Sequence, residues 1–233
     1  MPASLFIYQF IDRSGSFGVV KIRLCLNVVM IAAITLSCPA YAKPRLVDAA
    51  AFDVASVKLG MTPEEARQAL VTHGYSVGAD SMAESWNTRV ASEAGKYANT
   101  PKDNTRAVYA TQAEGPESQK VEVLYEITAS GSHARKITYS RPGSQGDIRS
   151  VAIQKYGQPT RVSMNAFRYC SEIKDCPQYL YDNAPSPSME VLYSYSGRSS
   201  VILSQGKNLD MRWQAAFSDA VRKLAPNYGK AAF

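Results

Sequence analysis

Few side chains in this sequence can do chemistry, because its 233 residues include only four cysteines and two histidines. Cys170 and Cys176 lie six positions apart. A redox motif needs the tighter C-x-x-C spacing, and a zinc site needs more nearby ligands than the distant His73 and His133 provide. In an exported chain, an even pair of cysteines is expected to be oxidised. We therefore predict a structural disulfide between Cys170 and Cys176.

Ser171 and Lys174 match S-x-x-K, the nucleophile pattern of penicillin-binding enzymes. That chemistry also needs a K-T-G strand and a far larger fold, and the sequence contains no K-T-G. The position of both residues between two cysteines favours an exposed loop. H-E-x-x-H, the P-loop and G-x-G-x-x-G are also absent.

The two histidines also have simple structural interpretations. We expect His73 to contact the terminal carbonyls of a helix and His133 to be solvated in a hairpin turn. A Ser-His-Asp site is defined by geometry rather than by sequence spacing. An envelope hydrolase with an unrecognised Ser/His site therefore stays the alternative function. We assign no catalytic residue, no metal ligand and no cofactor.

The composition is that of a globular protein, with 45% hydrophobic and 20% charged residues. It excludes a disordered chain, a collagen-like chain and a multi-span membrane protein. The formal net charge is +6. This mild and dispersed charge does not predict nucleic-acid binding, which would need a clustered and larger positive excess.

The N-terminus has the features of a secretory signal peptide. Lys21 and Arg23 precede a 13-residue apolar run at 24–36, and Ala40-Tyr41-Ala42 follows it. The run is shorter than the roughly 20 residues that span a bilayer. We predict cleavage between Ala42 and Lys43, which gives a periplasmic or secreted chain without a transmembrane segment.

Alternatives to cleavage at Ala42 are a retained membrane anchor and a lipoprotein attached through Cys38. The long segment before the basic residues also suggests that translation starts near Val20. Loss of residues 1–42 removes three cations and one acid, which lowers the formal net charge from +6 to +4.

An internal repeat organises the rest of the chain. Residues 121–139 and 189–204 both contain Glu-Val-Leu-Tyr, at 122–125 and 190–193. Both continue through a polar, glycine-containing turn into a second run rich in β-branched and aromatic residues, which is a hairpin pattern.

A helix is predicted before each hairpin. In the first half, Thr62 is the N-cap, Pro63 takes the first helical position, and Glu65 completes a capping box. The expected core stripe of this helix is Ala66, Ala69, Leu70 and His73. In the second half, residues 147–156 place Ile148, Val151, Ala152 and Tyr156 on one face.

Further elements are predicted between and after these units. They are a helix at 82–94, strands at 106–112, 161–169 and 179–181, and a closing helix at 210–224 with Trp213, Phe217, Val221 and Leu224 on one face. We expect the closing helix to dock on the sheet rather than lie on a membrane. The predicted organisation is a signal peptide (1–42), a first repeat (43–141) and a second repeat with the closing helix (142–233).

The segment GMTPEEARQAL, within residues 57–75, resembles the helix start of the SmpA/OmlA family of small outer-membrane assembly lipoproteins. Two such helix-plus-sheet units in one exported chain resemble the tandem layout of β-lactamase-inhibitor-type proteins. The resemblance implies an α+β fold with helices on one face of an antiparallel sheet, and binding rather than catalysis.

These observations predict an exported, non-enzymatic binding or scaffold protein of the bacterial envelope, whose partner is another envelope protein. Strand tyrosines such as Tyr125, Tyr139, Tyr193 and Tyr195 are expected mainly to pack in the core. Those that face outward would suit a binding surface. The charged Cys170–Cys176 loop is expected to be stabilised locally, with pre-shaped recognition as the alternative.

Overall fold

The structure is a computed structural model that describes residues 46–96, 102–112, 118–143, 145–174, 176, 184–193 and 197–227. The chain divides into two compact units, residues 1–40 and 41–233, and the description below concerns the second. The predicted signal peptide, its cleavage between Ala42 and Lys43, and the strand expected at 179–181 all lie outside the described residues.

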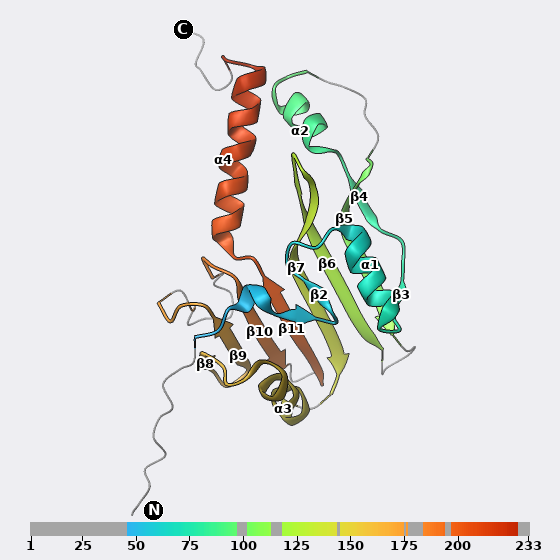
Figure 1. Ribbon diagram of the computed structural model, residues 1–233, viewed down its shortest axis with the longest axis vertical. Coiled ribbons are helices and arrows are strands. Elements are labelled where there is room, and N and C mark those ends of the chain that lie inside the picture. Colours follow the sequence, from blue (N-terminus) through green and yellow to red (C-terminus); the bar gives the residue numbers. More distant parts are fainter. Residues whose placement is uncertain are drawn as a thin grey trace, which may run out of the picture. The chain divides into compact units, whose positions relative to one another are not determined.

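The described residues form an α+β fold, as the sequence predicts (Figure 1). The helices are η1 (Ala49–Ala51), α1 (Pro63–Thr72), α2 (Trp86–Glu93), α3 (Gln145–Tyr156) and α4 (Lys207–Leu224). The strands are β1 (Asp53–Val54), β2 (Val57–Lys58), β3 (Ser76–Val77), β4 (Ser81–Ala83), β5 (Asn104–Gln112), β6 (Gln119–Thr128), β7 (Gly131–Pro142), β8 (Arg161–Val162), β9 (Ala166–Cys170), β10 (Ser188–Tyr193) and β11 (Arg198–Ser204).

Nine of these strands form one antiparallel sheet in the order β3-β5-β6-β7-β11-β10-β9-β8, with β4 also paired to β5. Strands β1 and β2 form a separate hairpin. Within the large sheet, β5-β6-β7 and β9-β10-β11 are two three-stranded meanders that meet where β7 pairs with β11.

The two Glu-Val-Leu-Tyr segments lie in the middle strand of each meander, β6 and β10. Val123 and Val191 are both fully buried, and Glu122 and Glu190 lie on the opposite face of the sheet. The segments therefore hold equivalent places. This equivalence agrees with the tandem repeat, which itself stays a prediction.

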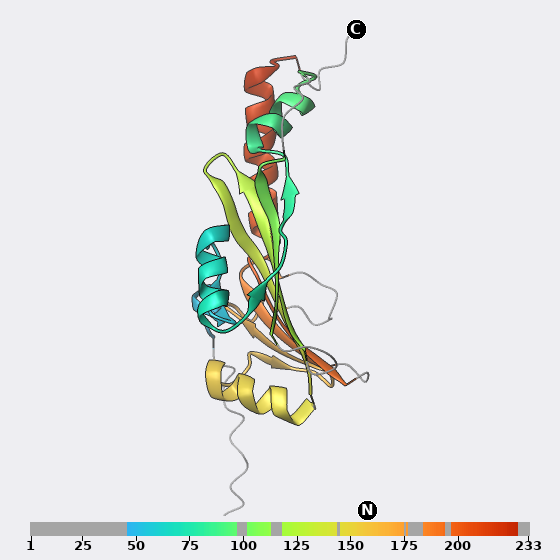
Figure 2. The ribbon, with the colours of Figure 1, turned by 90° about the vertical axis from the view of Figure 1, so that its right-hand side faces the viewer.

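The core follows from the register of the strands. One row of directly paired residues crosses six strands and is fully buried throughout: Val108, Val123, Ile137, Leu203, Met189 and Tyr169. Helices α1 and α3 cover this face of the sheet (Figure 2), together with the β1–β2 hairpin. Their buried contributions are Val54, Val57, Ala66, Leu70, Ile148 and Ala152.

Helix α1 begins with the predicted capping box. The backbone N–H of Glu65 donates to Thr62 Oγ1 at 3.4 Å, and the backbone N–H of Thr62 donates to Glu65 Oε2 at 2.8 Å. The bonds from Thr62 hold the pKa of the Glu65 carboxyl below its usual value. Ala66 and Leu70 of the predicted stripe are buried, whereas His73 is exposed.

A bulge in β7 fixes where α1 starts. Leu124 pairs with Lys136 but Tyr125 pairs with Ala134, so β7 has one extra residue at this point. The backbone N–H of Gly60 donates to Ala134 O, and the backbone N–H of Ala134 donates to Met61 O, both at 2.8 Å. The chain is thereby held to the sheet just before Thr62.

Two predicted helices differ in their details. Helix α2 starts at Trp86 rather than at residue 82, because residues 81–83 pair with β5 as strand β4 and Ser85 caps the helix. Helix α3 starts at Gln145, and Val151 is 47% exposed rather than part of the core.

The docking of the closing helix on the sheet is only partly as predicted. Helix α4 packs against α2, where the rings of Trp86, Trp213 and Phe217 lie within 5.6 Å of one another. Its hydrogen bonds to the sheet include one from Trp213 Nε1 to Ile127 O at 2.8 Å and one from Arg135 of β7 to Asp210 at 3.0 Å. Of the predicted stripe, only Val221 is buried.

The capping box gives a first testable prediction. Thr62→Ala removes the side-chain acceptor for the Glu65 N–H and should lower the free energy of unfolding by about 1 kcal/mol. Thr62→Ser keeps an acceptor and should lower the free energy of unfolding by less. Denaturant titration followed by circular dichroism measures both, and equal losses would contradict the role of the cap.

Candidate functional site

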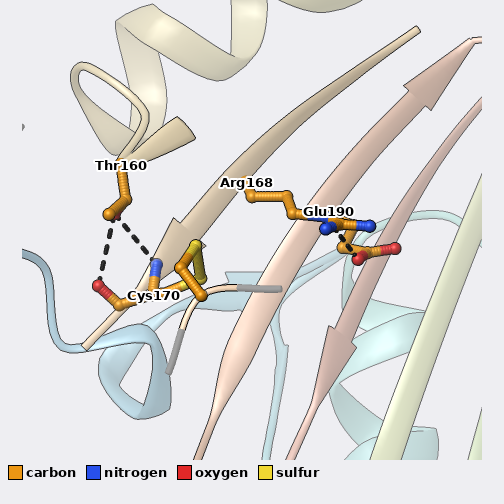
Figure 3. Close-up of a disulfide and its surroundings, with 5 residues drawn as sticks. Thr160, Arg168, Cys170 and Glu190 are labelled. Atoms are coloured by element: carbon orange, nitrogen blue, oxygen red, sulfur yellow. Dashed lines mark hydrogen bonds and ion pairs between the residues drawn. A yellow bond between two sulfur atoms is a disulfide. The ribbon is translucent and has the colours of Figure 1, made fainter. Parts of the chain in front are cut away.

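Cys170 and Cys176 form the predicted disulfide, with their Cα atoms 5.5 Å apart. Both residues are buried, at 2% and 3% exposure. Cys170 ends β9, and its backbone forms two hydrogen bonds with the buried Thr160 hydroxyl (Figure 3). The disulfide is therefore packed inside the structure, which the polar loop sequence does not predict.

The loop between the two cysteines is exposed, as expected. Glu172 and Lys174 form an ion pair at 2.9 Å with side-chain exposures of 53% and 77%. The Lys174 ammonium is thus directed to a carboxylate, and no hydrogen bond joins it to Ser171 among the described residues. The S-x-x-K pattern does not form a nucleophile pair here.

His73 caps the C-terminus of α1, as predicted. Its Nδ1 lies 3.1 Å from the carbonyl oxygen of Ala69, and its Nε2 lies 2.8 Å from Ser56 Oγ. Ser56 and Ala55 form the β1–β2 turn with positive φ angles of 66° and 50°. Left-handed backbone at non-glycine residues is strained, and the bond to His73 helps to hold it.

His133 lies in strand β7, where it pairs with Glu126 of β6. Its ring nitrogens lie 3.2 Å from Ser130 Oγ and 3.3 Å from Gly60 O. The hairpin is as predicted, but the histidine lies in its second strand rather than in the turn, and its ring contacts the segment before α1 rather than solvent alone. Neither histidine bonds to a carboxylate within the described ranges, so neither completes a Ser-His-Asp arrangement.

Gly74-Tyr75-Ser76-Val77-Gly78 matches G-x-S-x-G. In α/β-hydrolases this pattern makes a turn from a strand into a helix. Here it follows helix α1 and enters strand β3, which pairs with β5 at the edge of the sheet. Ser76 therefore lies in an exposed strand rather than at a nucleophile turn.

The sheet face opposite α1 and α3 carries a second row of directly paired residues. In strand order from β5 to β9 they are Tyr109, Glu122, Thr138, Ile202, Glu190 and Arg168. Tyr109 is 43% exposed, and the next three are partly exposed. We call this partly exposed surface, with its neighbours Leu124, Lys136, Leu192 and Ser200, the open face.

At the β9 end the row becomes buried around an ion pair. Arg168 Nε lies 2.8 Å from Glu190 Oε1, with side-chain exposures of 5% and 18% (Figure 3). Burial raises the pKa of Glu190, while the neighbouring Arg168 charge opposes the rise. The sequence analysis missed this pair, although the Glu122–Glu190 equivalence places Glu190 on this face.

Other kinds of site find no support in the described residues. Within them, no three histidine, cysteine or acidic side chains gather where a metal ion would bind. Among the described helices, none combines the length and hydropathy needed to cross a membrane. The disulfide fits a protein outside the reducing cytosol.

Comparison with known proteins gives no relative: no family model, no curated protein and no solved structure matches the chain. The resemblance of residues 57–75 to the SmpA/OmlA family therefore stays a prediction.

The buried disulfide gives a second testable prediction. Cys170→Ser with Cys176→Ser should still fold and lose about 2 kcal/mol, the loop-closure contribution for a ring of this size. Because both positions are buried, the hydroxyls add a desolvation cost, so the matched Cys→Ala pair should lose less. Circular dichroism and melting curves test both, and a double variant unfolded at room temperature would contradict the prediction.

The Arg168–Glu190 pair gives a third testable prediction. Glu190→Ala leaves a buried guanidinium without its carboxylate and should cost about 3–5 kcal/mol. Replacing both, as Arg168→Met with Glu190→Leu, should be close to neutral. Glu122→Ala lies on the same row and has no ion pair with any described residue, so it should stay within about 0.5 kcal/mol of the parent. An unchanged free energy of unfolding for Glu190→Ala in urea titrations would contradict the role of the ion pair.

Proposed function

We propose that this chain is an exported, non-enzymatic binding or scaffold protein of the bacterial cell envelope. The open face carries the proposal, because it presents partly exposed side chains across one continuous antiparallel sheet. The signal-like N-terminus and the buried disulfide support a periplasmic or secreted location.

The composition of the open face suits contact with another protein. It combines an exposed aromatic ring, Tyr109, with partly exposed aliphatic side chains at Leu124, Leu192 and Ile202. Polar and charged groups, including Glu122, surround them. Mixed apolar and polar side chains of this kind are found in protein interfaces, with tyrosine enriched among the residues that contribute most affinity.

The partner that fits best is another envelope protein. The open face carries both signs of charge, with Glu122 on β6 and Lys136 on β7. A nucleic-acid surface would be dominated by positive charge. A face with both signs of charge selects its partner through pairs of opposite charges across the interface, rather than through attraction between net charges.

An envelope hydrolase is the second candidate, and the Ser56–His73 contact of 2.8 Å favours it. If His73 Nδ1–H donates to Ala69 O, Nε2 is free to accept the Ser56 proton. The nearby Asp53 carboxylate, however, accepts from the Ser56 backbone N–H and pairs with Lys155 at 2.7 Å. This dyad therefore has no carboxylate to orient it, and it ranks below binding.

The binding proposal is tested by capture from envelope extract with the mature chain, residues 43–233. The parent is compared with Tyr109→Ala and Ile202→Lys on the open face. Val71→Lys is the matched control, since Val71 is 60% exposed on α1. We expect a protein retained by the parent and by Val71→Lys but lost with both open-face variants.

Capture that is insensitive to the open-face variants would contradict the proposal. An ester or peptide panel run in parallel distinguishes the second candidate. Turnover that Ser56→Ala abolishes, without a partner for the open face, would reverse the order of the two functions.

A further inference from the structure

A cleft of about 740 Å³ lies where α2 and α4 meet the sheet. Figure 1 shows both helices near the turn that joins β6 to β7. The cleft is lined by β4, α2, the start of β5, the C-terminal half of β6, β7 and α4. Its size lies within the range of small-molecule sites in proteins.

Glu126 is the unusual residue of this cleft. It is only 8% exposed, and its carboxylate has no hydrogen bond or ion pair among the described residues. Burial raises its pKa, and Arg135 is the main charge opposing that rise. Arg135, however, is paired with Asp210 at 3.0 Å. The carboxylate oxygens of Glu126 are not fully enclosed, so their donor comes from outside the chain, as water or as a ligand in the cleft.

The cleft also holds positive charge without an acidic partner. Lys102 and Arg106, before and within β5, form no ion pair in the part of the chain that the structure describes. The guanidinium of Arg89 lies 4.8 Å from the centre of the Trp213 ring. The cleft therefore presents an unpaired acid on β6 and unpaired bases around β5, beside an aromatic wall.

We propose that the cleft binds a short peptide with free amino and carboxyl ends. The ammonium of the peptide supplies the donor that Glu126 lacks, and its carboxylate lies toward Lys102 and Arg106. Trp213 and Leu124 contact the apolar part of the ligand.

A ligand with both charges fits better than a simple anion or cation. An anion at Arg106 alone would leave Glu126 without a donor. A cation at Glu126 alone would make no use of the exposed bases Lys102 and Arg106. A ligand with an ammonium and a carboxylate pairs with groups of both signs, and this proposal does not depend on a protein partner at the open face.

Four peptides test the assignment: trialanine, N-acetyl-trialanine, trialanine amide and the doubly blocked form. The chain has two tryptophans, Trp86 and Trp213, whose ring centres lie 5.6 Å apart beside the cleft. Their fluorescence therefore reports binding to the mature chain without a label. Blocking either end should weaken binding about tenfold or more, since charge-assisted bonds are lost.

Protein variants assign each end. Glu126→Gln should remove the preference for the free amino group, and Arg106→Gln the preference for the free carboxylate. Glu64→Gln, at an exposed position of α1 outside the lining of the cleft, is the matched control and should bind like the parent. Melting curves establish that each variant is folded. If Glu126→Gln does not fold, Arg106→Gln still tests the proposal, because Arg106 is exposed.

Equal responses to the four peptides, or no response to any of them at millimolar concentration, would overturn the proposal. Water would then be the only partner of Glu126. Loss of peptide binding leaves capture by the open face unaffected, so failure here is distinguishable from failure of the proposed function.

Discussion

The pairing of β7 with β11 is the interaction on which the rest of the structure depends. Seven residue pairs, from Arg198 with Pro142 to Ser204 with Lys136, join two three-stranded meanders into one sheet. Both rows of side chains cross this junction, so it makes the core continuous on one face and the open face continuous on the other. Separated meanders would each expose a long strand edge, and neither would bury its apolar face as fully.

The β1–β2 hairpin reinforces this junction from the core side. Val54 and Val57 are buried against the sheet, where β1 contacts both β7 and β11. The β1–β2 hairpin is also bonded to helices α1 and α3. Ser56 bonds to His73 at the end of α1, and Asp53 accepts from Lys155 and Tyr156 of α3. A segment of a few residues thus bonds both to the nearby end of α1 and to α3, about 100 positions further along the chain.

An element of this structure can be predicted from the sequence when the residues that determine it lie close together along the chain. The start of α1 is predictable because the capping box lies within four residues, Thr62 to Glu65. The start of α2 is not, because Met82 pairs with Thr105 across an intervening helix. The disulfide follows from cysteine count and compartment, whereas the Arg168–Glu190 pair needs the register of β9 with β10. The cleft around Glu126 is invisible in sequence, since its lining comes from six separate segments.

The lengths of the outer strands have a consequence for how copies of the molecule meet. The large sheet ends in β8 on one side and in β3 and β4 on the other, and these strands have only two or three residues. Such edges offer few backbone donors and acceptors to a neighbouring chain. The long strands, with their alternating apolar residues, all lie inside the sheet. As far as the described strands go, growth into fibres by strand addition is therefore disfavoured at both borders of the sheet.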